Sequence, residues 1–327
     1  MKAIIRTKAG KNLSTMLVQD LPEPQPLPKQ IKVKVVSSRI NPVDIDLMKG
    51  MPFLKYKDPQ IGGIDGAGEV LEVGTEVTQF KTGDQVFFYR KFTDIGTWAE
   101  EIVLDAKDAA KVPPNLSIQE AGAIALPLLT AYEALQALNP ERGQSVLIHG
   151  AGGGVGFQAV QLVQMMGLHV IANAGPKDQN ALKAVGIQQF INYKDQAFDH
   201  VLETGSVDYI FDVLGGETLL RSITLQPKKV VSTAYPNTAD LHKTGIKMPA
   251  FVRWIMNLAT RKYPNAARRH QVQLIGQVTG ANGTLLQEAA DLIEGSTYTV
   301  RPFRTLSLAK ASAKGLANTP VGTILQF

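Results

Sequence analysis

The sequence predicts an α/β protein with two domains, an irregular β-barrel-like domain and a domain built on a doubly wound parallel sheet. Three observations carry this prediction. The chain of 327 residues exceeds the size of one ordinary domain. Its first 120 or so residues read as short strands separated by turns, and strands then alternate with helices from about residue 117. Such alternation is typical of βαβ units.

The first part of the chain is predicted to hold strands over residues 1–6, 31–36, 66–73, 85–89 and 97–104. These stretches alternate polar and apolar residues or are rich in β-branched residues, and glycine or proline turns lie between them. Many short strands at close spacing favour a compact barrel-like domain over an open sheet.

The second part begins with a predicted helix over 117–138, which we expect Pro127 to interrupt. Further predicted helices span 157–166 and 179–185, and predicted strands span 145–149, 169–174, 190–193, 207–214 and 228–234. A last strand over 322–326 is expected to return to the first domain. The predicted boundaries are 1–122 for the first domain, 123–270 for the sheet domain, and 271–327 for a return segment that completes the first.

The composition excludes several kinds of chemistry. The chain has no cysteine, which excludes disulfides, thiolate zinc sites, iron–sulfur clusters and thiol nucleophiles. Its five histidines are scattered without ligand spacing, so we expect no metal site. We also expect no signal peptide, because Arg6 and Lys8 leave no long apolar run near the first residue. We expect no transmembrane helix, because the longest stretch free of Asp, Glu, Lys and Arg, 143–176, is rich in glycine and glutamine. A cytoplasmic protein is the resulting expectation.

The strongest local signal is a glycine-rich turn between a predicted strand and a predicted helix. The glycines follow a G-x-x-G-x-x-G spacing at Gly150, Gly153 and Gly156. Glycines let a diphosphate approach the backbone, and the unpaired amides and dipole of a helix N-terminus attract the anion. The pattern predicts dinucleotide binding.

The end of the second strand of this domain indicates which dinucleotide is bound. The strand ends at Asn173 and Ala174, and no carboxylate follows before Asp178 to accept from a ribose 2′-hydroxyl. A 2′-phosphate could instead bind Lys177, with Tyr193 adding a hydroxyl group. We therefore expect NADPH. The alternative is that Lys177 is a solvated turn residue.

Several motifs then match one family over nearly the whole chain: Asn41-Pro-Val-Asp44, Gly63-Ile-Asp-Gly-Ala-Gly-Glu-Val70, Gly96-Thr-Trp-Ala-Glu100, Leu126-Pro-Leu-Leu-Thr-Ala-Tyr-Glu133, the turn 150–156, Ile191-Asn-Tyr-Lys194 and Asp212-Val-Leu-Gly-Gly-Glu217. On these residues the chain resembles the zinc-independent quinone oxidoreductase branch of the medium-chain dehydrogenase/reductase superfamily.

The resemblance implies a GroES-like β-barrel-type catalytic domain around a Rossmann domain, with NADPH as cofactor and a homodimer as the assembly. By position it places Thr130 near the nicotinamide and Asn41 toward the substrate. The other implied cofactor-binding residues hold the diphosphate, the 2′-phosphate region or the adenosine side: Gly153, Gly154, Val155, Asn173, Lys177, Tyr193, Leu214 and Thr233.

The implied activity is metal-independent hydride transfer from NADPH to a quinone or an α,β-unsaturated carbonyl. Such an acceptor is already electron-poor, so neutral donors suffice to stabilise the charge that develops on its oxygen. Asn41 and Tyr56 are the candidate catalytic residues. The alternatives are an enoyl thioester reductase, or a weakly active protein on the same fold that binds nucleic acid or a membrane.

One segment stands apart in charge. The net charge is +5, and residues 241–287 contain seven cations and no Asp or Glu. Within it, 249–263 is predicted to form an amphipathic helix with Phe251, Trp254, Ile255 and Leu258 on one side. We interpret it as a lid or dimer-edge helix with a solvated basic end and expect no specific nucleic-acid binding. Contact with nucleic acid or an anionic membrane is the alternative.

Overall fold

The structure of the chain is a computed structural model that describes residues 1–8, 16–50, 58–235, 237–308, 316 and 319–327. The candidate residue Tyr56 lies outside these ranges. The described chain divides into two compact units: unit 1 comprises Met1–Leu126, Thr244–Ile246 and Gly280–Phe327, and unit 2 comprises Pro127–Lys243 and Lys247–Thr279. The boundaries between these units lie after Leu126 and after Thr279, whereas the boundaries expected from the sequence lie after residues 122 and 270.

Unit 1 is built mainly on antiparallel strands. A three-stranded sheet has the order β2-β1-β4, formed by β1 (Lys2–Arg6), β2 (Met16–Asp20) and β4 (Gln60–Ile61). A seven-stranded sheet has the order β15-β16-β3-β5-β6-β8, with β7 also paired to β3. Its strands are β3 (Gln30–Arg39), β5 (Asp65–Val73), β6 (Gln85–Tyr89), β7 (Glu101–Asp105), β8 (Ala109–Lys111), β15 (Thr305–Ser307) and β16 (Ile324–Gln326).

These strands close around an apolar core. The inward residues of β3, β5 and β6 pack with those of β7 into one buried cluster that includes Val33, Val70, Phe88 and Leu104. The C-terminal strand β16 pairs with β3, so the end of the chain is part of the sheet of unit 1. Among the described residues, helices α1 (Pro42–Lys49) and α9 (Gly283–Ile293) also belong to this unit, as do short 3-10 turns at Phe92–Asp94 and Ala106–Asp108.

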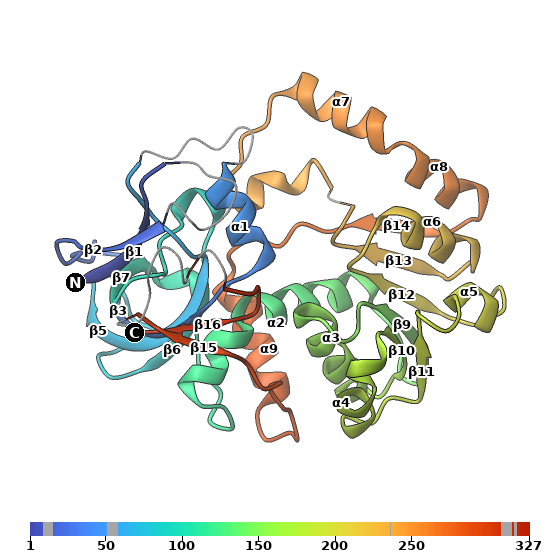
Figure 1. Cartoon of the computed structure of the whole chain (residues 1–327), viewed down its shortest axis with the longest axis horizontal. Coiled ribbons are helices and arrows are strands. Elements are labelled where there is room, and N and C mark those ends of the chain that lie inside the picture. Colours follow the sequence, from blue (N-terminus) through green and yellow to red (C-terminus); the bar gives the residue numbers. More distant parts are fainter. Residues whose placement is uncertain (9–15, 51–57, 236, 309–315, 317–318) are drawn as a thin grey trace. The chain divides into compact units, whose positions relative to one another are not determined.

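Unit 2 contains a six-stranded parallel sheet (Figure 1) with the order β11-β10-β9-β12-β13-β14. The order reverses direction at β9, which is the point where open α/β sheets bind ligands beyond the carboxyl ends of their strands. The strands are β9 (Ser145–His149), β10 (His169–Ala174), β11 (Gln189–Asn192), β12 (Tyr209–Asp212), β13 (Lys229–Ser232) and β14 (Gln273–Gly276). The sequence analysis omitted β14, a short and half-buried edge strand.

Helices connect these strands as the βαβ pattern predicts. They are α3 (Gly154–Met165), α4 (Gln179–Ala184), α5 (Phe198–Val201), α6 (Gly216–Thr224), α7 (Ala250–Thr260) and α8 (Lys262–Arg269), with 3-10 turns at Pro176–Asp178 and Asp240–Thr244. The predicted helix over 249–263 is thus two consecutive helices, α7 and α8, which meet at Arg261.

Helix α2 (Ile118–Leu138) runs through Pro127 without interruption, so the expected break is wrong. Proline leaves the carbonyl four residues before it without its helical donor. Here that carbonyl belongs to Ala123, and Arg39 Nη1 donates to it over 2.9 Å. The side chain of Arg39 thus replaces the lost hydrogen bond. In the described residues, α2 is the one helix long and apolar enough to span a membrane, and 72% of its most apolar window is buried inside the protein.

Candidate functional site

The glycine-rich turn lies between β9 and α3, at the carboxyl end of the central strand of unit 2. Gly150 has a φ of +68°, a conformation that residues with a side chain rarely adopt. A Cβ atom built on Gly156 would overlap the carbonyl oxygen of Gly150, so the first turn of α3 packs directly on the loop. These two glycines give the loop its tight shape.

The N-terminus of α3 is open to an anion. Gly153 is the N-cap residue, it is exposed, and no side chain caps the helix there. A Cβ on Gly153 would meet only the Gly150 carbonyl within 4 Å, so no side chain of the described residues packs against Gly153 on that side. The first amides of a helix have no internal partner, and those of Gly154 and Val155 therefore fit the diphosphate of a dinucleotide.

The ends of β10 and β11 bring two candidate residues together. Tyr193 directly follows β11, and its amide donates to the carbonyl of Ala174 at the end of β10 over 3.3 Å. Its ring lies in contact range of Gly175, two residues before Lys177. The side chains of Lys177 and Tyr193 are both exposed. The strand pairing therefore places a cation and a phenol hydroxyl at the same edge of the sheet.

The nearest carboxylate in the sequence, Asp178, points elsewhere. It is buried, and its carboxylate occupies the position that a Cβ on Gly152 would take. Asp178 therefore packs against the glycine turn instead of standing exposed beside Lys177. The sequence analysis treated Asp178 only as a residue beyond the strand, because its contact with Gly152 depends on the fold.

Asn173 lies in the interior beneath the turn. Its Nδ2 is 2.8 Å from His149 Nδ1, and His149 Nε2 is 2.8 Å from Ser222 Oγ. Because Ser222 Oγ donates to the Thr218 carbonyl over 2.7 Å, its single hydrogen is used, and we assign the proton of the imidazole to Nε2. Burial lowers the pKa of His149 to about 3, so the ring is neutral. His149 is thus a hydrogen-bonded core residue.

The remaining candidates of unit 2 lie on different elements. Thr130, on α2, is buried, and its carbonyl accepts from Gln277 Nε2 over 2.8 Å. Leu214 is exposed after β12, and Thr233 is half-buried after β13. Like the glycine turn, Leu214 and Thr233 follow the carboxyl ends of their strands.

Unit 1 holds the other candidate, Asn41, in a buried polar cluster. Asn41 is the N-cap residue of α1, and its backbone amide donates to Asp44 Oδ2 over 2.7 Å. Its side-chain Nδ2 donates to Asp65 Oδ1 over 2.9 Å, and the amide of Leu126 donates to Asp65 Oδ2 over 3.2 Å. Asn41 is only 2% exposed. Asn41 therefore links two buried carboxyl groups, that of Asp44 through its backbone amide and that of Asp65 through its side-chain amide.

Both carboxyl groups have raised pKa values. Burial is the main cause for Asp65 and raises its pKa to about 7, against hydrogen bonds from Leu126 and Asn41 and the charge of Arg39. Burial also raises the pKa of Asp44 well above its ordinary value, and the neighbouring charge of Asp65 adds to the effect. The sequence analysis did not single out Asp65, although an acidic residue within the glycine-rich stretch 62–68 was a visible signal.

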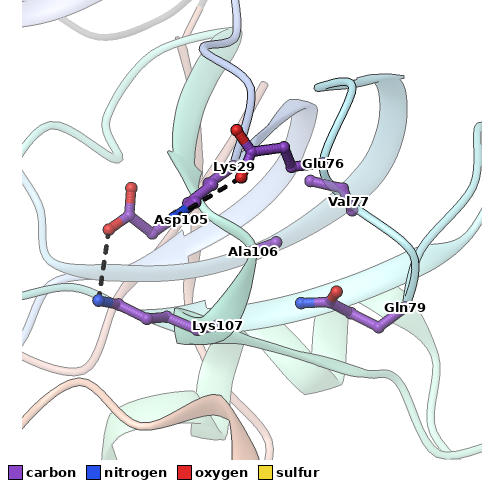
Figure 2. A pocket seen from close by; sticks show the side chains of 7 residues that line it. All are labelled: Lys29, Glu76, Val77, Gln79, Asp105, Ala106 and Lys107. Carbon is purple, nitrogen blue, oxygen red and sulfur yellow. Dashed lines mark ion pairs between the residues drawn. The ribbon is translucent and has the colours of Figure 1, made fainter.

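A separate surface hollow of about 230 Å³ contains none of the candidate residues. It lies in unit 1, where Lys29 pairs with Glu76 over 3.6 Å and Lys107 pairs with Asp105 over 3.8 Å (Figure 2). The charged side chains that line it are therefore paired with one another.

Comparison with known proteins places this geometry in a family. The alcohol dehydrogenase GroES-like domain matches residues 27–114, and the zinc-binding dehydrogenase domain matches residues 185–313. Human quinone oxidoreductase is 33% identical over 232 residues, which cover 69% of this chain and 70% of the human protein. The chain belongs to the quinone oxidoreductase branch of the medium-chain dehydrogenase/reductase superfamily.

Solved structures agree with this membership. The quinone oxidoreductase of Coxiella burnetii is 25% identical with a TM-score of 0.81, over 100% of this chain and 99% of that one. The Escherichia coli quinone oxidoreductase complexed with NADPH has the same fold, with 22% identity and a TM-score of 0.75 over the full length of both chains. The Rossmann-like parallel sheet and the GroES-like domain predicted from the sequence are therefore confirmed, and the protein is an oxidoreductase of this superfamily.

The description of one matching domain implies zinc, but the residues present do not fit that metal. The chain has no cysteine, and its described residues contain no group of three His, Asp or Glu side chains placed to hold an ion. The buried carboxyl groups of Asp44 and Asp65 are instead engaged with Asn41. No step of the reaction considered below is assigned to a metal.

Proposed function

We propose that this oxidoreductase uses NADPH to reduce a quinone or an α,β-unsaturated carbonyl compound. The observation that carries the proposal is the open N-terminus of α3 at the same sheet edge as the exposed Lys177 and Tyr193. A diphosphate fits the former and a 2′-phosphate the latter. The relative in E. coli, whose structure was solved with NADPH, supports the choice of cofactor.

The inward position of Asp178 also favours NADPH over NADH. A carboxylate that accepts from the ribose 2′-hydroxyl would repel a 2′-phosphate. Asp178 is buried against Gly152, so within the turn Pro176–Asp178 the exposed charge is the cation of Lys177. Bound NADPH would supply a hydride to the acceptor.

On the side of the acceptor, the proposed role of the chain is to stabilise negative charge on its oxygen. Asn41 and Tyr56 are the proposed donors. The Nδ2 group of Asn41 already donates one hydrogen to Asp65, and this bond fixes the orientation of the amide. Any contact between Asn41 and a substrate therefore depends on Asp65 holding that orientation.

Cofactor affinity tests the proposal directly. Replacing Lys177 with alanine should weaken NADPH binding by about 1–3 kcal/mol, the range for a hydrogen bond to a charged group, and leave NADH binding nearly unchanged. The matched control is Lys183→Ala, which removes an exposed lysine of the same unit on α4. Titration of each protein with both cofactors measures the effect. Equal affinity of the unchanged protein for NADPH and NADH would contradict the proposal.

Turnover with a panel of acceptors tests the substrate class. With NADPH as donor we expect reduction of quinones and simple enones, and negligible oxidation of ethanol, because the described residues present no metal site to stabilise an alkoxide. Activity confined to enoyl thioesters would replace the proposed substrate class while leaving the cofactor assignment intact.

A further inference from the structure

The outer face of α7 carries a stripe of large apolar side chains. Phe251, Trp254, Ile255 and Leu258 are 67%, 65%, 52% and 45% exposed. Their spacing of i, i+3, i+4 and i+7 places them on one side of the helix. Four adjacent large apolar residues on one exposed face are uncommon in a monomeric protein and mark a surface that binds something.

Packing within unit 2 does not explain this stripe. No residue of α7 is buried, although the helix is 11 residues long. Its described side-chain hydrogen bond to the rest of the unit runs from Thr238 to Asn257 over 2.9 Å. Helix α8, in contrast, packs against α6 and β14 and buries Ala267. Figure 1 shows α7 extending beyond α8 and away from the sheet of its own unit. The protein thus maintains a helix whose apolar face has no partner within unit 2.

The two helices α7 and α8 and the residue between them also carry five cations: Arg253, Arg261, Lys262, Arg268 and Arg269. All five are exposed, and no carboxylate of the described residues pairs with any of them. Elsewhere in the described chain, exposed lysines do pair with carboxylates, such as Lys228 with Asp208 over 2.9 Å. The absence of Asp and Glu between residues 241 and 287 keeps the charge unopposed.

We propose that this α7–α8 surface, the apolar stripe with its five cations, binds the surface of a membrane that contains anionic phospholipids. An amphipathic helix with Phe, Trp and Leu on one side and Lys or Arg around it lies at the boundary between headgroups and acyl chains. The aromatic and aliphatic side chains enter the acyl boundary. The cations contact the lipid phosphates, which supply the negative charge that the protein lacks here.

Two other partners fit less well. A second copy of the chain joined across a two-fold axis would bring the same surface against itself, and five unpaired cations would meet five others without a carboxylate between them. RNA would use the cations but would leave Ile255 and Leu258 without an apolar partner, because neither stacks on a base as an aromatic ring does. An anionic membrane offers acyl chains to the apolar stripe and phosphate groups to the cations, so it fits both parts of the surface.

Trp254 provides the measurement. The chain has two tryptophans, and the other, Trp98, is fully buried in unit 1. With the full-length protein, vesicles of phosphatidylcholine with 30% phosphatidylserine should shift the tryptophan emission to shorter wavelength, and vesicles of phosphatidylcholine alone should not. Co-sedimentation with the same vesicles gives the affinity. Raising the salt concentration should weaken the binding, because it screens exposed charges.

Two variants separate the halves of the surface. The triple variant Phe251→Gln, Ile255→Gln, Leu258→Gln keeps Trp254 as reporter and should lose at least tenfold in affinity. The quadruple variant Arg261→Gln, Lys262→Gln, Arg268→Gln, Arg269→Gln should lose about fivefold for each cation removed. Its matched control replaces four exposed lysines elsewhere, Lys8, Lys34, Lys81 and Lys183, with glutamine. This control has the same net charge as the quadruple variant but should bind the vesicles like the wild type.

The following results would overturn the proposal. One is no binding of the wild type to anionic vesicles. Another is equal loss of binding in the quadruple variant and its lysine control, which would indicate a response to net charge only. A third is a concentration-dependent dimer, seen by light scattering, that the triple variant abolishes and that does not bind vesicles, since a second copy would then cover the stripe. All these measurements are independent of turnover and therefore of the proposed function.

Discussion

A buried imidazole in unit 2 and two buried carboxyl groups in unit 1 respond to burial in opposite ways. Beneath the glycine turn of unit 2, His149 is held neutral between Asn173 and Ser222, and burial lowers its pKa to about 3. In unit 1, the buried carboxyl groups of Asp44 and Asp65 share one asparagine, and burial raises the pKa values of both. Burial thus disfavours the protonated form of His149 in unit 2 and favours the protonated forms of Asp44 and Asp65 in unit 1.

The difference shows how each unit fixes the residues proposed to act. In unit 2 the groups proposed to bind the cofactor are backbone amides and exposed side chains, so the buried network needs only to be rigid. In unit 1 the candidate Asn41 is itself a member of the buried network. Its orientation depends on ionisable partners, and we therefore expect unit 1 to be the more sensitive to substitution and to pH.

The largest effect should come from Asp65→Ala. This change leaves the Leu126 amide and Asn41 Nδ2 without their buried acceptor and removes the carboxylate nearest Arg39. Loss of one partner from a buried charged network costs about 3–5 kcal/mol of unfolding free energy. Urea unfolding followed by circular dichroism measures it. Asp46→Ala, at an exposed position on α1, is the control and should change stability by less than about 0.5 kcal/mol.

The matching change in unit 2 is Ser222→Ala, which removes the acceptor of His149 without exposing a charge. It should cost about 1–3 kcal/mol, the range for an unpaired buried neutral group. If Ser222→Ala were as costly as Asp65→Ala, the contrast between the two interiors would not hold.

The next prediction concerns pH, where the two units should act with opposite sign. Asp65 has an ordinary pKa of 3.8 and a folded value of about 7, so between these pH values the folded protein binds the proton more tightly and stability falls as pH rises. His149 has an ordinary pKa of 6.5 and a folded value of about 3, so over that range the unfolded chain binds the proton and stability rises with pH.

Each single variant removes the contribution of one group to the pH dependence of stability, so the contribution of the other group becomes visible. We expect Asp65→Asn to make unfolding free energy rise more steeply with pH between about 4 and 6.5, by up to about 1.4 kcal/mol per pH unit. His149→Gln should change the slope by a similar amount in the opposite direction. Urea midpoints measured across this pH range test both, with Asp46→Asn as the control. A uniform loss of stability without a change of slope would count against the assigned protonation states.

The sequence predicted the part of this molecule that rests on local patterns. The strands Ser145–His149 and His169–Ala174 were predicted at their observed bounds, because apolar and β-branched residues between glycine turns favour a strand with ends at those turns. Helix α1 was not among the predicted helices. The signal was present: Asn, then Pro, then Asp three residues on is a helix start with a capping box. The contacts of Asp65 with Asn41 and of Arg39 with Ala123 join residues far apart in the chain, which local patterns do not show.

The smallest expected effect concerns the exposed edge of unit 2, where the side chain that is changed lies in solvent and not in the interior. Replacing Tyr193 with phenylalanine removes only the hydroxyl, and the exposed ring beside Gly175 remains. If that hydroxyl contacts the 2′-phosphate, NADPH affinity should fall by about 0.5–1.5 kcal/mol, the net value of one hydrogen bond exposed to water, while NADH affinity and stability stay unchanged. Binding titrations of the variant with both cofactors measure the difference. An equal loss for NADPH and NADH would instead mean that Tyr193 contacts a part common to both, and Lys177 alone would then carry the discrimination between them.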